Sequence, residues 1–328
     1  MSRRVVQIVP SLPPPHEGVG SFATILGAAL SSCFGIESRF LVPAPGALAD
    51  VTGEGEATLL LHYANYGYAP RGCPSWLIEG LTQWKTRSRG RLVTLFHEFR
   101  ASGPPWRSSF WLSPLQRRLA TALMRLSDGL VTTLQLHARI LQGWVPGREI
   151  AVLPVFSTVG EPPETPPLAA RARRLVVFGG PGTRALAYRE LKPAIAHACR
   201  ALGIEEILDI GPGDEPPASD LPVPVRRLGP LPNAEVSKLL AGSLAGFIGY
   251  PAPFLAKSTI FAAYCAHRVL PICAWPRPRR DTLPAEPPPP FWTPGDDALQ
   301  EIADRAHAWY GGHDVGHHAA TYGGLLFP

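Results

Sequence analysis

Residues 247–274 constrain the fold more than any other stretch of the chain. They read as a buried strand, a loop with two prolines, a short apolar helix and a second buried strand. Two buried strands joined through a helix are typical of a parallel sheet. Ser258 is the predicted N-cap of that helix, with Lys257 before it and Thr259 in its first turn. Free N–H groups behind a lysine favour an anion site at the end of a strand, although every such crossover contains some helix N-terminus.

The same alternation of strands and helices fills both halves of the chain, and 328 residues exceed what one hydrophobic core usually organises. The predicted fold class is α/β, with two Rossmann-like, doubly wound parallel sheets facing an interdomain cleft. The predicted strands span residues 5–9, 38–42, 58–61, 92–96, 129–132 and 150–152, then 175–178, 206–210, 225–228 and 245–248.

A proline-rich stretch separates the two halves. Residues 161–167 contain four prolines and two glutamates, which is typical of an extended linker. We therefore expect an N-terminal domain at 1–158, a linker at 159–172 and a C-terminal domain at 173–328. A helix opened by Ser113 and Pro114 is predicted to cover the first sheet up to about residue 127. A closing helix is predicted at about 296–310.

Polar residues follow several strands of the first half, where parallel sheets usually bind ligands. His16, Gly18 and Gly20 follow the first strand, and the glycines either allow close approach of a ligand or only relieve strain in a turn. His97 and Glu98 end another strand and are candidates for proton transfer or for binding a hydroxyl; Glu98 alternatively forms only a local cap or ion pair.

A second polar group of the first half is a candidate acceptor site. His62, Asn65 and Tyr66 follow the strand at 58–61, and Arg107 lies in the loop after Glu98. Such residues offer stacking surfaces and hydrogen bonds to a sugar or polyol; the alternative is an aromatic packing loop.

In the second half, a glycine-rich loop at 179–183 follows a predicted strand. The loop lacks the Gly-Lys-Ser/Thr of a P-loop, which disfavours nucleoside triphosphate hydrolysis. Arg184 and Lys192 follow and are predicted to hold a diphosphate together with Lys257.

Charge and cysteine content limit the partners. The net charge of +5 suits an anionic ligand or an acidic membrane surface, and no nucleic-acid signature is present, so no nucleic-acid partner is expected. Five scattered cysteines without a Cys-x-x-Cys pair indicate a reducing cytoplasm. The basic run at 85–91 is either a solvated turn or a patch for a membrane or acidic acceptor. No apolar run is long enough for a bilayer, so any membrane contact is expected to be peripheral.

Metal and cofactor sites are not expected from the sequence. His313 and His317 have the spacing that suits a metal on a helix, but the surrounding glycines disfavour a helix there. We therefore predict no metal site and no cofactor, only a nucleotide-diphosphate sugar as co-substrate.

The order of these parts resembles the GT-B glycosyltransferases, specifically the retaining, nucleotide-sugar-dependent family 4 group. Four short segments carry the resemblance: His-Glu-Gly-Val-Gly at 16–20, Val-Thr-Leu-Phe-His-Glu at 93–98, the stretch from 178 to 192, and Leu-Gly-Pro-Leu-Pro-Asn-Ala-Glu-Val at 228–236. The resemblance implies a cytoplasmic hexosyltransferase that moves a sugar to an envelope, exopolysaccharide or other glycan or lipid-linked acceptor without a metal.

One departure from that family concerns its paired glutamates. The corresponding positions lie near Phe254 and Ala262, and neither carries a carboxylate. The resemblance assigns the diphosphate to Gly18, Gly20, Arg184, Lys192, Lys257, Ser258 and Thr259. His97 would bind or assist at the transferred sugar, and His16 would be the base if the reaction inverts. A catalytically inactive GT-B-like assembly protein, an epimerase and a phosphorylase are the alternatives, the last two disfavoured by few cleft carboxylates and by chain length.

Overall fold

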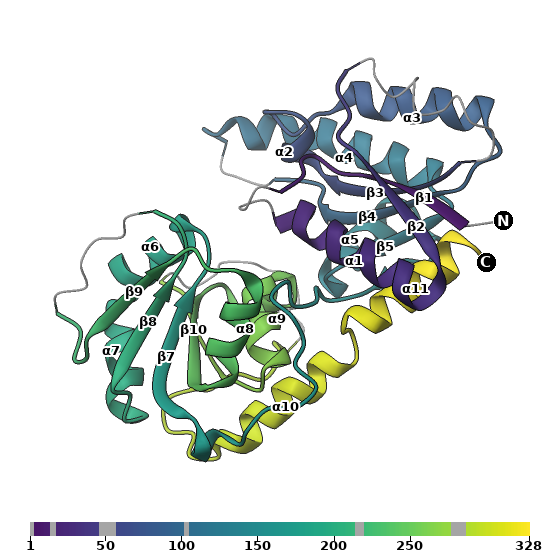
Figure 1. The fold of residues 1–328 in the computed structure, drawn as a ribbon. Helices are drawn as coiled ribbons and strands as arrows, with labels where there is room; N and C mark the ends of the chain where they lie inside the picture. The colour runs from purple at the N-terminus through teal and green to yellow at the C-terminus, as the bar shows by residue number, and fades with distance from the viewer. Residues whose placement is uncertain (1–2, 14–17, 46–56, 102–104, 214–219, 277–286) are drawn as a thin grey trace. The chain divides into compact units, whose positions relative to one another are not determined.

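The computed structural model describes residues 3–13, 18–45, 57–101, 105–213, 220–276 and 287–328 (Figure 1). The chain divides into two compact units. Unit 1 comprises Met1–Pro154 and Val315–Pro328, and unit 2 comprises Val155–Asp314. The chain therefore leaves unit 1 once and returns to it, so that its last segment belongs to the first unit rather than to the C-terminal domain expected from the sequence.

Unit 1 is built on a parallel sheet of six strands in the order β2-β1-β3-β4-β5-β6. Its strands are β1 (Arg3–Ile8), β2 (Ile36–Leu41), β3 (Thr58–Ala64), β4 (Leu92–Glu98), β5 (Gly129–Thr132) and β6 (Ala151–Val152). Its helices are α1 (Gly18–Phe34), α2 (Asn65–Tyr68), α3 (Ser75–Arg87), α4 (Ser108–Leu126), α5 (Gln135–Trp144) and α11 (Val315–Leu326).

Unit 2 is built on a parallel sheet of five strands in the order β11-β10-β7-β8-β9. Its strands are β7 (Ala172–Phe178), β8 (Glu206–Ile210), β9 (Val225–Gly229), β10 (Ser243–Gly249) and β11 (Leu270–Ala274). Its helices are α6 (Pro181–Arg189), α7 (Lys192–Ala201), α8 (Asn233–Ala241), α9 (Thr259–Ala266) and α10 (Leu299–Gly311), with short 3-10 turns at η2 (Leu168–Ala170) and η3 (Ala252–Lys257). The predicted α/β class with two parallel sheets is confirmed.

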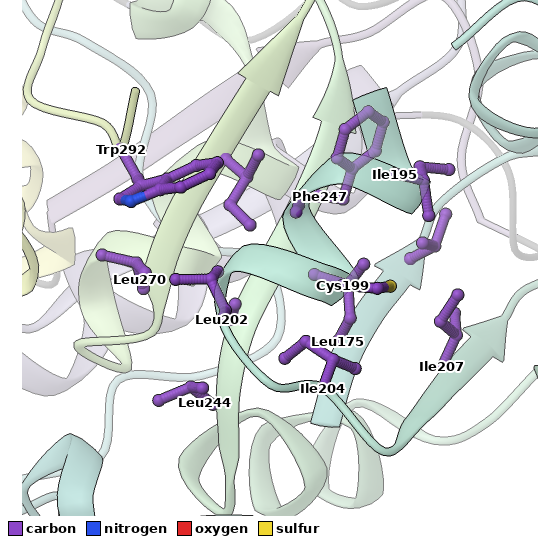
Figure 2. Close-up of a cluster of buried hydrophobic side chains, with 14 of the residues drawn as sticks. Leu175, Ile195, Cys199, Leu202, Ile204, Ile207, Leu244, Phe247, Leu270 and Trp292 are labelled. Atoms are coloured by element: carbon purple, nitrogen blue, oxygen red, sulfur yellow. The ribbon is translucent and has the colours of Figure 1, made fainter. Parts of the chain in front are cut away.

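One hydrophobic core of unit 2 lies between its sheet and α7 (Figure 2). Ile195, Cys199 and Leu202 of α7 and the turn after it pack with Leu175 of β7 and Phe247 of β10. The other face of the sheet packs tightly on Tyr264 of α9. A Cβ atom on Gly246 would lie 2.4 Å from that ring, so β10 needs glycine at this position.

Two helices differ from the sequence expectations. Helix α4 begins at Ser108, earlier than the predicted Ser113, and holds Pro114 in its interior. The carbonyl of Phe110, which this proline leaves without an N–H donor, belongs to an exposed residue, so water can solvate it. The Nε1–H of Trp111 donates to the Pro105 carbonyl at 2.7 Å and ties down the added turn.

Helix α11 is the second difference, because its glycines made a helix there unexpected. Gly323 faces the α1–β2 junction, where a Cβ atom would lie 3.7 Å from Phe34 and 3.9 Å from Ile36. These distances are ordinary contacts, and Ala319, Tyr322 and Leu326 of α11 are buried as well. The packing of α11 on unit 1 outweighs the low helix propensity of its glycines.

Candidate functional site

The carboxyl end of the unit 1 sheet carries the histidine that the sequence singled out. His97 lies at the end of β4 with 9% of its surface exposed, and Glu98 after it is exposed. The Nε2 of His97 lies 3.3 Å from Nδ1 of His62, and the two rings are stacked with centroids 5.6 Å apart. His62, predicted as an acceptor contact, is fully buried on β3, so it reaches a ligand only through His97.

The contact between the histidines continues as a row of hydrogen bonds toward the edge of the sheet. The Nε2–H of His62 donates to Oε1 of Gln7 at 2.9 Å, and Nε2 of Gln7 donates to Oγ of Ser38 at 2.9 Å. Burial lowers the pKa of His62 to about 3, which keeps its imidazole neutral. We call Ser38, Gln7, His62 and His97 the polar row.

Residues of α1 and α11 pack around His62 and His97, at the end of the polar row that lies farther from the sheet edge. The Phe22 ring of α1 meets the rings of His62, His97 and His318 edge to face, at centroid distances of 6.0, 5.4 and 5.5 Å. His318 belongs to α11, and its Nε2–H donates to the Pro154 carbonyl at 2.8 Å. Gln7, Phe22 and Ser38 were not predicted, because a polar residue inside a strand and an apolar residue inside a helix give no sequence signal of a site.

The other predicted acceptor residues lie along the same side of unit 1. Asn65 is buried at the start of α2, and its Nδ2 donates to the Gly72 carbonyl at 3.3 Å. The Tyr66 hydroxyl accepts from Nε2 of Gln116 at 3.2 Å while 40% of Tyr66 stays exposed. Arg107 is exposed at the N-cap position of α4. Tyr66 and Arg107 are thus accessible to an acceptor, whereas Asn65 shapes the loop.

The two glycines after β1 have different surroundings. Gly18 begins α1, and a Cβ atom added to it would meet no other atom within 4 Å, so its backbone is open to a ligand. A Cβ on Gly20 would lie 2.6 Å from the Ser11 carbonyl oxygen, so Gly20 serves the packing of the loop against α1. His16, the predicted base for an inverting reaction, lies outside the described residues.

In unit 2, the start of α9 and the loop after β7 come together at the carboxyl end of the sheet. Ser258 caps α9 as predicted, its Oγ accepting from the Phe261 N–H at 3.2 Å. A Cβ on Gly179 would lie 2.6 Å from Cδ1 of Ile260, so only glycine lets the loop approach α9 this closely. Thr259 is half-buried in the first turn, and Lys257 lies two positions before it.

Two cations predicted for the diphosphate are engaged in ion pairs of different kinds. Nζ of Lys192 lies 2.6 Å from Oδ2 of Asp220, whose side chain is 77% exposed. Arg184 is 1% exposed, and its Nε and Nη2 donate to Asp209 at 2.8 and 3.2 Å. Its Nη1 donates to the Pro212 carbonyl. A ligand reaches the Arg184 guanidinium only by breaking a buried pair, whereas it can replace Asp220 at the surface.

The positions that correspond to the paired glutamates lie on η3 and α9. Phe254 is in η3, and Ala262 is 1% exposed within α9. The residue at 262 therefore faces the interior of unit 2 instead of an open surface.

A separate cavity of about 680 Å³ lies between the sheet of unit 2 and α8. Leucines at 208, 228, 231 and 239 line it together with Arg174, Arg226, Lys238 and Glu235. It contains none of the predicted diphosphate residues. Among the described residues, no group of three His, Cys, Asp or Glu side chains lies close enough to hold a metal ion. No helix in the described part of the chain is long and apolar enough to cross a bilayer.

No protein-family model matches the chain, and no curated protein matches it in sequence. Solved structures match it over both units. An alpha-glucosyltransferase in complex with UDP superposes with a TM-score of 0.59 at 10% identity, covering 99% of this chain and 100% of that one. An alpha-glucosyltransferase with UDP and a 13-mer DNA containing a HMU base gives 0.55 at 11%, covering all of both chains.

WaaG, a glycosyltransferase involved in lipopolysaccharide biosynthesis, is similar with a TM-score of 0.55 at 12% identity, covering 98% of this chain and 99% of that one. The E. coli trehalose-6-phosphate structure with bound UDP-2-fluoro glucose gives 0.56 at 11%, covering 99% of each. The chain therefore has the GT-B fold of these glycosyltransferases, which confirms the predicted architecture.

Proposed function

We propose that this protein is a glycosyltransferase that moves a sugar from a nucleotide-diphosphate donor to a glycan or lipid-linked acceptor. The observation that supports it most is the meeting of the Gly179 loop with the Ser258-capped start of α9, within a fold shared over the full length with UDP-binding transferases. UDP is the first donor nucleotide to test, because the neighbouring structures contain UDP or a UDP sugar.

Unit 2 would hold the donor diphosphate. The N–H groups of the first turn of α9 and the ammonium of Lys257 supply positive potential at one point of the sheet edge. Lys192 adds a second charge, because its exposed pair with Asp220 contributes little and a phosphate can take the place of the carboxylate. Arg184 would act indirectly, because it holds the loop after β8 in place through Asp209 and the Pro212 carbonyl.

Departure of the diphosphate develops negative charge on its oxygens. The N–H groups of the helix N-terminus and the ammonium groups of the lysines would stabilise that negative charge, and in this proposal no metal ion is needed for it.

Unit 1 would bind the acceptor and would contribute the residues that contact the transferred sugar. His97 would bind a hydroxyl of the transferred sugar, and Glu98 and His16 are the remaining candidates for proton transfer. Tyr66 and Arg107 are exposed and would contact the acceptor. The acceptor class is proposed as glycan or lipid-linked glycan. One neighbouring structure contains a 13-mer DNA, but a DNA acceptor for this protein is disfavoured by the lack of a nucleic-acid signature in its sequence.

Calorimetric titration with UDP, GDP and TDP tests the donor site. We expect micromolar binding of one diphosphate, and a loss of roughly 1.5–3 kcal/mol in Lys257→Ala, as for a charged hydrogen bond. Arg200→Ala removes an exposed charge at the far end of α7 and serves as the matched control with unchanged affinity. Folded protein that binds none of the three nucleotides would refute the proposal.

The rival function is a catalytically inactive GT-B-like partner in polysaccharide assembly, which the missing glutamate pair favours. Incubation with the sugar nucleotides of whichever base binds separates the two. A transferase releases free nucleoside diphosphate over time, and the release falls in His97→Ala. Tight binding without any release in the presence of acceptor extracts would favour the inactive partner.

Peripheral membrane contact is proposed for the start of α4. Trp106 is 83% exposed and Trp111 is 70% exposed, beside the exposed Arg107. Aromatic rings and arginines are the side chains that favour the interface of an anionic bilayer. Vesicles containing phosphatidylglycerol should sediment the wild-type protein but not Trp106→Ser/Trp111→Ser, while Trp275→Ser in unit 2 is the control. Equal sedimentation of all three proteins would place the contact elsewhere.

A further inference from the structure

The polar row crosses four neighbouring strands of unit 1, and the proposed function accounts only for its last member. Ser38 lies on β2, Gln7 on β1, His62 on β3 and His97 on β4, in the order in which these strands adjoin in the sheet. Three consecutive hydrogen bonds join them, at 2.9, 2.9 and 3.3 Å. Gln7, His62 and His97 are buried, and Ser38 is half-buried on the edge strand β2. Buried polar side chains are costly unless each bond is made, which indicates a role beyond packing.

The bonding of Gln7 gives the row a direction. Its Nε2 donates to Ser38, so its Oε1 faces His62, and an amide oxygen only accepts. Nε2 of His62 must therefore carry the proton of that ring. Since a neutral imidazole has one N–H, Nδ1 of His62 is an acceptor, and the group that donates to it is the Nε2–H of His97.

We infer that Gln7 and His62 are positioning residues that keep a proton on Nε2 of His97, so that Nδ1 is the nitrogen at which His97 gains and loses a proton. The role of that nitrogen in sugar transfer rests on the proposed function. The assignment of the proton does not, because it follows from the hydrogen bonds of the row.

Helix α1 keeps the row in place. A Cβ atom on Gly27 would lie 3.0 Å from Nε2 of Gln7 and 3.1 Å from Cβ of Ser38, so the helix packs directly on that end. At the other end, the edge-to-face contacts of Phe22 with both histidine rings restrict their rotation. A side chain larger than hydrogen at 27 would press on the amide that sets the direction of the row.

The row also isolates His62 from other charges. Two titratable side chains among the described residues bond to it: His97 of β4 meets its ring, and the Tyr68 hydroxyl of α2 donates to its backbone carbonyl at 3.0 Å. His318 of α11 lies across the Phe22 ring. Because burial favours the neutral form of His62, its ring carries a single proton, which the bond to Gln7 keeps on Nε2.

Nuclear magnetic resonance of protein labelled with ¹⁵N-histidine tests this directly, because long-range ¹H–¹⁵N correlations distinguish a protonated from an unprotonated ring nitrogen. We expect both His62 and His97 to carry their neutral-state proton on Nε2, with signals assigned from the His62→Asn and His97→Asn spectra. Wild-type His97 with its proton on Nδ1 would overturn the inference, whether or not the protein has transferase activity.

Variants separate positioning from simple packing. Gln7→Met keeps the shape of the side chain and removes the amide oxygen, so His97 should then show averaged signals of both tautomers. Thr94→Val is the matched control. Thr94 lies on β4, as His97 does, and its loss removes a buried hydrogen bond to Ser127 outside the row. An unchanged His97 tautomer in Gln7→Met would show that Gln7 does not set the position of the proton on His97.

The activity readout links the row to the proposed reaction. In Gln7→Met we expect kcat to fall roughly tenfold or more with unchanged UDP affinity, because the donor site lies in unit 2. A kcat equal to that of the Thr94→Val control would overturn the catalytic part of the inference. Absence of turnover in every variant, with the tautomers as expected, would instead count against the proposed function.

Discussion

Asp209→Asn should destabilise unit 2 strongly, because it removes the charge that the buried Arg184 needs. The guanidinium donates to both carboxylate oxygens of Asp209 and to the Pro212 carbonyl, and the two side chains are 1% and 3% exposed. Breaking a buried ion pair by neutralising one partner costs about 3–5 kcal/mol, since the remaining charge stays desolvated. The cost should fall on β8 and on the β7–α6 loop that contacts it.

Hydrogen exchange followed by mass spectrometry measures this cost within each unit separately. Peptides covering β8 should exchange between about 100-fold and about 4,000-fold faster in Asp209→Asn, at 1.4 kcal/mol per factor of ten. Peptides of β3 and β4 in unit 1 should keep their rates and serve as the internal control.

A double variant tests whether the loss of stability in Asp209→Asn comes from the unpaired buried charge of Arg184. Arg184→Met with Asp209→Leu replaces both charges by apolar side chains and should be more stable than Asp209→Asn alone. A change below about 1 kcal/mol in Asp209→Asn would refute the reasoning and would mean that Arg184 can leave the interior. In that event a direct contact between Arg184 and a diphosphate becomes the simpler explanation of its position.

Three further predictions concern other contacts. Gly246→Ala should cost about 1–3 kcal/mol, because its methyl group meets the Tyr264 ring at 2.4 Å; denaturant unfolding of unit 2 with an unchanged midpoint would contradict this. Ser258→Ala should cost about 1 kcal/mol through the lost cap of α9 and should also weaken UDP binding, whereas Ser258→Asp should retain the cap. Burial holds the pKa of His62 at about 3 and that of His267 at about 4, below the unfolded value of 6.5. The unfolded chain therefore binds more protons below pH 6.5, and each unit should lose roughly 2 kcal/mol between pH 7.5 and pH 5, which His62→Phe should abolish for unit 1 in thermal unfolding.

Much of the fold follows from local patterns in the sequence. Strand β8 at Glu206–Ile210 and strand β5 at Gly129–Thr132 have the bounds that their apolar runs predict. The Ser258 cap of α9 also follows from its residue type. These features depend on neighbours within a few positions along the chain, and so a single sequence reveals them.

The features that were not predicted depend on residues far apart in the chain. Helix α11 packs on α1 through several buried residues, and its Gly323 lies beside Phe34, almost 290 positions earlier. Gln7 joins the site because β1 lies between β2 and β3 in the sheet. This order of strands in the sheet differs from their order along the chain, so local patterns do not reveal it. The ion pair of Arg184 with Asp209 likewise joins a helix to a strand that follows another helix. Residue type suggested a ligand for Arg184, and only the fold shows its partner.

The return of the chain to unit 1 affects the order in which the protein is completed during synthesis. Phe22 of α1 is made early but can meet His318 only once α11 exists. Arg91, just before β4, likewise donates to the Leu325 carbonyl of α11 only after that helix is made. All of Val155–Asp314 emerges from the ribosome in between. Unit 2 can thus finish folding first, although it starts second, and the part of α1 that packs on α11 stays uncovered until α11 is made.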